Sequence, residues 1–214
     1  MALRRALGRS YDAEIAHLAE PPGRFTTLKT QHALSLPPGC ADWGQLLREA
    51  TPHEKIRERT TSVWEAGELG TAPYVGVMIR SGSKAHPKTV QASPTDWYLD
   101  FCARVRKETH IDRFFLSTDS PEAEEVFSRT FPGTVTVAPK GRYNSVEGVR
   151  DAITDLYLLA SSAMIVGPYW SSFVTMAEKL APQVPSYNSM SDDGKINLQS
   201  SIDVARDPLS PWAR

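Results

Sequence analysis

The sequence predicts an α/β fold, a single parallel sheet flanked by helices. Short apolar runs at 74–80, 114–117, 134–138, 163–167 and 184–187 alternate with stretches whose apolar residues recur at helical spacing. The run at 163–167, AMIVG, has no polar residue, as expected of a strand buried on both faces. Strands that alternate with helices are typical of parallel sheets built from right-handed crossovers.

The composition is that of an ordinary globular chain. It has 214 residues (23.7 kDa), 41% hydrophobic and 23% charged, which favours one domain with arms. A net charge of -1 gives no argument for nucleic acid or a membrane surface as partner. Only two cysteines occur, Cys40 and Cys102, and no run reaches membrane-spanning length. We therefore expect a protein of the cytoplasm.

The first 70 residues are expected to form an arm followed by helices. Residues 1–40 contain a short helical pattern, 12–18, between Pro/Gly breakers. Residues 41–66 predict two helices, the first with Trp43, Leu46, Leu47 and Ala50 on one face and the second beginning at Thr51-Pro52. We assign 71–188 to the domain that carries the sheet and 189–214 to a polar tail with partial packing.

Four further helices are predicted between and after the strands. A Ser93-Pro94 cap begins one that runs to about Lys107, and Pro121 begins the next. The third has one apolar face, and the fourth follows an N-cap at Ser171-Ser172. The side chains expected to point inward on the second and third are Ala123, Val126, Phe127, Val149, Ile153, Leu156, Leu159 and Ala160.

Polar and charged residues follow the predicted strands. In a parallel sheet ligands bind beyond the carboxyl ends of the strands, where these residues converge. Cations and a helix N-terminus suit phosphate, and carboxylates suit a ribose or base. The ends carry Arg80 to Lys84, Thr118-Asp119, Lys140 with Arg142, and Tyr169 to Ser172. The pattern favours a nucleotide or phosphorylated ligand.

Three segments resemble the fucosyltransferase-like group of GT-B glycosyltransferases, which includes protein O-fucosyltransferases, α1,6-fucosyltransferases and the rhizobial nodulation fucosyltransferase. They are VGVMIRSGSK at 75–84, FFLSTDSPEAEEVFSRTFP at 114–132 and DLYLLASSAMIVGPYWSSF at 155–173. The matching order covers residues 74–188 and implies the Rossmann-like, C-terminal donor-binding half of a GT-B enzyme.

The resemblance implies a GDP-sugar donor. No His/Cys/Asp cluster has metal-ligand spacing, so we expect no metal or other cofactor. Arg80 falls on the arginine that neutralises the diphosphate, with the basic Lys84 just after it, and Asp119 on the aspartate of the second motif. Asp155 falls on the helix carboxylate that reads guanine, and Ser171 with Ser172 on the hydroxyl pair of the phosphate-binding helix.

Several features depart from the family pattern. Met78 stands where the family usually has histidine, and Ser83 where it has an acidic residue. The arginine that often follows the serine pair is absent, and residues 1–70 are too few for an acceptor domain. We expect a homodimer or a hetero-complex to supply the missing half.

Each candidate residue also has a structural alternative. Ser171 is a helix cap, Arg80 a surface charge, and Asp119 a cap for the helix at Ser120-Pro121. Asp155 forms a buried salt bridge, for example to Arg150. His86, outside the three motifs, is a general base or a solvated loop histidine, and Trp170, inside the third motif, stacks on a base or sugar or packs in the core.

Two functional classes follow. In the first, the protein is a glycosyltransferase in which Arg80 and the Ser171/Ser172 helix start stabilise the departing diphosphate, and Asp119 or His86 takes the acceptor proton. In the second, it is a non-transferring or repurposed relative that acts as a partner subunit or catalyses a different reaction. We favour the first; the acceptor remains unassigned.

Overall fold

The computed structural model describes residues 42–83, 85–196 and 207–213. The chain divides into two compact units, 1–43 and 44–214, and the elements below belong to the second, apart from the first residue of α3. The predicted helix 12–18 and Cys40 lie outside the described residues. Within the described ranges, no helix combines the length and apolar character needed to cross a membrane.

The described part is an α/β unit with one all-parallel sheet, which confirms the predicted fold class. The strand order is β3-β2-β1-β4-β5. The strands are β1 (Val75–Ile79), β2 (Phe114–Thr118), β3 (Val135–Thr136), β4 (Met164–Val166) and β5 (Ser186–Tyr187). The helices are α3 (Trp43–Glu49), α4 (Glu54–Ala66), α5 (Pro87–Ala92), α6 (Thr95–Thr109), α7 (Pro121–Thr130), α8 (Val146–Ala160) and α9 (Ser172–Leu180).

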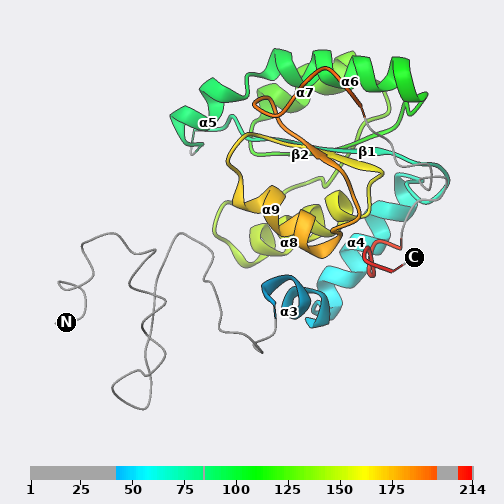
Figure 1. The fold of residues 1–214 in the computed structure, drawn as a ribbon. Coiled ribbons are helices and arrows are strands. Elements are labelled where there is room, and N and C mark those ends of the chain that lie inside the picture. Colours follow the sequence, from blue (N-terminus) through cyan, green and yellow to red (C-terminus); the bar gives the residue numbers. More distant parts are fainter. Residues whose placement is uncertain (1–41, 84, 197–206, 214) are drawn as a thin grey trace, which may run out of the picture. The chain divides into compact units, whose positions relative to one another are not determined.

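Helices cover both faces of the sheet (Figure 1). Helices α6 and α7 lie over one face, where an aromatic core forms around Phe101, Phe114, Phe127 and Phe131. Helices α4, α8 and α9 lie over the other, where Tyr74 and the leucines of α8 are buried. Every residue of β1, β2 and β4 is buried, which explains why these strands have nearly continuous apolar sequences.

The central strand β1 lies against the C-terminal end of α8. A Cβ added at Gly76 would lie 2.8 Å from Ser162 Oγ and 3.1 Å from a methyl of Leu159. Only a residue without a side chain allows this approach. The close packing fixes α8 over β1 and, through it, the direction in which β4 leaves the helix.

Three local predictions were wrong. Val126 is 38% exposed, because Ala123 and Phe127, four residues apart, already define the inward face of α7. Val149 is 52% exposed, since the burial of α8 begins two residues later. Ser93 does not cap α6: it ends the short helix α5, which was not predicted, and Pro94 occupies the N-cap of α6.

Phe127 tests how much the aromatic core contributes. It is fully buried and packs against Phe114 and Phe131, with ring centroids 5.8 and 4.8 Å away. We expect Phe127→Ala to lower the free energy of unfolding by about 3–5 kcal/mol, because it removes apolar contacts and leaves a cavity. Urea unfolding measures this loss. The neighbouring Val126→Ala is the control and should change stability by less than about 1 kcal/mol; equal losses would contradict the assigned helix face.

Candidate functional site

The order of strands places a topological switch point beside β1. From β1 the chain adds β2 and β3 on one side, and it then returns to add β4 and β5 on the other. The segments after β1 and β4 therefore lead to helices on opposite faces, and in such sheets ligands bind beyond the carboxyl ends of strands at this point. Arg80 follows β1, and Ser171 lies between β4 and α9.

A direct contact joins the two sides of this switch point. The hydroxyl of Ser171 lies 3.6 Å from the sulfur of Met78, near the end of β1. The same hydroxyl accepts the N–H of Val174 at 3.3 Å, so Ser171 is the N-cap of α9, as the sequence predicts. Ser172 is exposed at the first helical position. The start of α9, with its partial positive charge, thus lies beside the end of β1.

Asp119 holds the loop that follows β1. Its Oδ1 accepts the backbone N–H groups of Ser81 and Gly82, at 3.1 and 2.9 Å. A Cβ at Gly82 would lie 2.5 Å from the carbonyl oxygen of Asp119, so the close approach requires glycine. The expected alternative, that Asp119 caps the next helix, is wrong, because Ser120 provides that cap by accepting the N–H of Ala123.

Arg80 and Asp119 also approach each other. Arg80 Nε lies 4.0 Å from Asp119 Oδ2, and more than a third of each side chain is exposed. An exposed pair at this distance contributes little to stability. The guanidinium is therefore accessible to an anionic ligand at the same edge as the start of α9. Lys84, which the sequence places after Arg80, lies outside the described residues.

His86 and Trp170 meet at the edge of this region. His86 is exposed and is the N-cap of α5, where its Nδ1 accepts the N–H of Lys88 at 3.2 Å. It is therefore not merely a solvated loop side chain, and in its neutral form the ring proton resides on Nε2. Its ring stands edge-to-face with that of Trp170, with centroids 6.2 Å apart. Trp170 is 70% exposed, so the alternative of core packing is wrong for this residue.

Asp155 is buried, and its ion-pair partner differs from the predicted one. Its Oδ2 accepts hydrogen bonds from Ser117 at 2.7 Å and from Lys140 Nζ at 2.8 Å, whereas Arg150 pairs with Glu147. Lys140 also donates to the carbonyl oxygen of Thr118 at 3.0 Å, so this cation is engaged at the end of β2.

Burial governs the electrostatics of Asp155. It raises the pKa of the carboxyl group, an effect that Lys140 and Ser117 oppose. Oδ1 is buried and has no hydrogen-bond partner within the described residues. Ser117 pairs with Met78 in the sheet register, so the carboxylate lies one strand away from the Met78–Ser171 contact, on the α8 and α9 face. Oδ1 of Asp155 is therefore a buried hydrogen-bond acceptor near the switch point, on the α8 and α9 face of the sheet.

A second carboxylate of α8 holds the loop after β3, and sequence reasoning missed it. Asp151 Oδ2 accepts the N–H of Gly141 at 2.7 Å, and Arg59 of α4 lies 3.5 Å from its Oδ1. Arg59 also donates to the carbonyl oxygens of Ala138 and Pro139. The available signal was the spacing of Asp151 and Asp155, which puts two acids on one face of an otherwise apolar helix.

Solved structures similar to this chain are fucosyltransferases, which confirms the resemblance found in the sequence motifs. The fucosyltransferase NodZ from Bradyrhizobium is 27% identical over 68% of this chain and 46% of its own, with a TM-score of 0.49. NodZ α-1,6-fucosyltransferase co-crystallised with GDP is 27% identical over 59% of this chain and 41% of its own (TM-score 0.44). POFUT1 in complex with GDP-fucose is 14% identical over 68% and 48% (TM-score 0.48).

This chain spans less than half the length of each of these proteins. No protein-family model and no curated protein matches it. At these TM-scores, the assignment of a function depends on the residues of the chain itself.

Replacing Lys140 tests how Asp155 is kept charged. We expect Lys140→Met to lower the free energy of unfolding by about 2–3 kcal/mol at neutral pH, because it leaves a buried carboxylate without its cation. A carboxyl group with a raised folded-state pKa favours the folded state fully only below its unfolded pKa of about 3.9. The deficit should therefore be smallest near pH 4, grow as the pH rises through the folded-state pKa, and then level off.

Urea unfolding between about pH 4 and 8 measures this profile. The double variant Lys140→Met/Asp155→Asn has no buried charge to compensate, and we expect it to recover much of the lost stability with a flatter pH dependence. A Lys140→Met protein as stable as the parent at neutral pH would show that the ion pair is not needed.

Proposed function

We propose that this protein is a fucosyltransferase-like glycosyltransferase that binds a GDP-sugar at the switch point beside β1, with residues 71–188 as its donor-binding part. The observation that carries the proposal is the juxtaposition of accessible Arg80 with the Ser171-capped start of α9 across the Met78–Ser171 contact. An arginine fork and a helix N-terminus are complementary to the two phosphates of a nucleoside diphosphate.

The proposed reaction breaks the bond between the anomeric carbon and the diphosphate. The oxygen of an acceptor hydroxyl attacks the anomeric carbon, GDP leaves, and a base takes the hydroxyl proton. Arg80, with Lys84 close in sequence, and the N–H groups around Ser171 and Ser172 would stabilise the charge that develops on the departing diphosphate. Asp119 and His86 are the candidate bases that follow β2 and β1, and both are exposed.

The base and the sugar have separate candidate contacts. As the resemblance implies, the carboxylate of Asp155 is the candidate contact for the paired N–H donors of guanine, while Trp170 offers an exposed aromatic face for a ring of the ligand. We further propose that a second copy or another protein closes the cleft and excludes water from the leaving group.

A second function is favoured by Met78. Where the resembling enzymes usually carry histidine, this chain has a thioether in contact with the α9 cap, so that position supplies no base. In the alternative, the nucleotide site persists in a non-transferring subunit or in an enzyme for another reaction. Nucleotide binding without transfer of fucose from GDP-fucose would favour this alternative.

Calorimetric titration tests the proposed site. We expect GDP and GDP-fucose to bind with affinities that are measurable at about 0.1 mM protein, and UDP and NAD to bind more weakly. Arg80→Ala should weaken GDP about tenfold or more, because a charge-assisted contact to phosphate is lost. Arg129→Ala is the matched control, since Arg129 is an exposed arginine at the end of α7 and pairs with Glu125. Equal affinities of a folded Arg80→Ala protein and the parent would rule the site out.

Base selectivity is expected to depend on Asp155. Asp155→Asn keeps an acceptor for Ser117 but replaces one acceptor oxygen by a donor, so its preference for GDP over ADP should fall by roughly tenfold. Paired titrations with the two nucleotides measure this ratio, and thermal unfolding measures stability alongside. A variant that melts much lower but retains its selectivity would mean that Asp155 acts only through its ion pair with Lys140.

A further inference from the structure

Four side-chain and backbone groups form a continuous chain of three hydrogen bonds beside the β4–α9 turn, residues 167–171. The N–H of Tyr169 donates to Ser93 Oγ at 2.8 Å, and Ser93 Oγ lies 2.9 Å from Ser189 Oγ. Ser189 donates in turn to the carbonyl oxygen of Ala92. Because the proton of Ser189 is used for Ala92, Ser93 must donate to Ser189, and all the bonds run in one direction. Such chains polarise one another and hold their members firmly.

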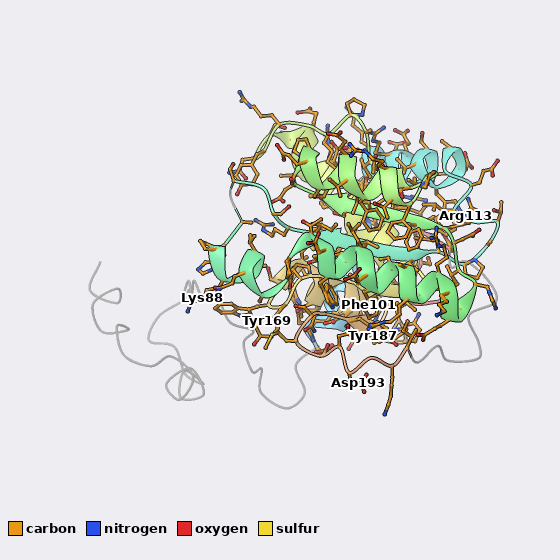
Figure 2. All side chains as sticks on the ribbon, turned by 90° about the horizontal axis from the view of Figure 1, so that it is seen from above. Lys88, Phe101, Arg113, Tyr169, Tyr187 and Asp193 are labelled. Atoms are coloured by element: carbon orange, nitrogen blue, oxygen red, sulfur yellow. The ribbon has the colours of Figure 1, made fainter. Side chains whose placement is uncertain are left out.

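The far end of the chain is anchored on α6. Ser189 belongs to the segment that follows β5, and Asp192 of this segment accepts two hydrogen bonds from Arg104, at 2.7 and 2.9 Å, and one from Trp97 at 3.1 Å. Figure 2 places Tyr187 beside Phe101, and the centroids of these two rings are 5.1 Å apart. Asp193 lies further along the segment that follows Tyr187. Although burial acts to raise the pKa of Asp192, its hydrogen bonds, first that from the N–H of Gly194, lower the pKa overall. The anchor is therefore ionised at neutral pH.

The near end of the chain supports a strained residue. Trp170, directly after Tyr169, has a φ of 64°, a left-handed conformation that is unfavourable for a bulky side chain. Strain of this kind persists only where the surroundings determine the backbone. The N–H of Tyr169, next to Trp170, donates to Ser93, which lies outside the turn. Figure 2 shows the side chain of Tyr169 on the same side of the molecule as Lys88 of α5.

We infer that Ser93 is a positioning residue: its hydroxyl, oriented by Ser189, fixes the Tyr169 backbone and thereby the direction of Trp170 and of the first turn of α9. Ser93 is buried, with 5% exposure, and lies at the junction of α5 and α6, the helices that follow β1. It therefore ties the segment after β1 to the segment after β4, the two sides of the switch point. Its effect on a nucleotide depends on the proposed function, whereas its effect on the turn does not.

Hydrogen exchange at the Tyr169 amide in the ligand-free, full-length protein tests the inference directly. Ser93→Ala should accelerate this exchange by roughly five- to tenfold, since the N–H loses its acceptor. Ser93→Thr keeps a hydroxyl and should retain most of the protection. Ser189→Ala leaves Ser93 in place but removes its acceptor, and it should accelerate exchange in the same direction by a smaller factor.

Ser161→Ala is the matched control. Ser161 is likewise buried and donates one side-chain hydrogen bond, to the carbonyl oxygen of Tyr157, at the C-terminal end of α8. This variant should lose comparable stability without changing exchange at Tyr169. Unchanged protection of Tyr169 in both Ser93→Ala and Ser189→Ala would overturn the inference, as would an equal acceleration in Ser161→Ala.

Calorimetry with GDP then separates the two proposals. If the parent binds GDP, Ser93→Ala should bind it roughly fivefold more weakly, and Ser93→Thr should recover the affinity. If the parent does not bind GDP, the proposed function fails, while faster Tyr169 exchange in Ser93→Ala still supports the positioning of the turn. Parent-like GDP affinity in Ser93→Ala, despite faster exchange, would overturn the link between the turn and the ligand.

Discussion

Burial of β1 on both faces is the constraint from which the rest of the architecture follows. A strand covered on both sides must be largely apolar and leaves its charged residues beyond its ends. Gly76 lets the end of α8 pack directly on this strand. That contact returns the chain to the other side of β1, so that β4 pairs with it and the topological switch point forms at its carboxyl end. Arg80 follows β1, and α9 follows the neighbouring strand β4. Because β1 and β4 are parallel and adjacent, the arginine and the start of α9 lie at the same edge of the sheet.

Three carboxylates hold the loops at this edge of the sheet, each through its own hydrogen-bond partners. Asp119 accepts two N–H groups of the loop after β1, and Asp151 accepts one from the loop after β3. Asp155 orients Lys140 towards the end of β2. These contacts explain why the edge that presents cations also contains so many acids. Much of the acidic character is directed at backbone N–H groups and at Lys140, so Arg80 and the N-terminus of α9 remain available for a ligand.

The repeated alternation of strands and helices was enough to predict the sheet. The spacing of apolar residues in the sequence reflects which side chains are buried, and in this fold burial follows from the layer of helices on each face of the sheet. The serine cap of α9 was also predictable, because a cap is a local bond between Ser171 and Val174. The errors about Asp155 and Ser93 share one cause: their actual partners are not local in the sequence. Arg150 is close to Asp155 along α8, yet the actual partner, Lys140, arrives from the loop after β3. Ser93 fits a helix cap by its local sequence, but its hydroxyl bonds Tyr169, 76 residues away.

Met78, in the first motif at 75–84, affects proton transfer and packing differently. Met78 cannot exchange protons, but it maintains the contact between β1 and α9, because its thioether touches the Ser171 hydroxyl. The arrangement that would bind a diphosphate is thus separable from the group that would move a proton. His86, whose Nδ1 is occupied by the α5 cap, can exchange a proton only through Nε2, and its ring stands against Trp170. In the proposed transfer, the acceptor proton would pass to Asp119, which follows β2, or to His86, which follows β1, and not to the strand itself.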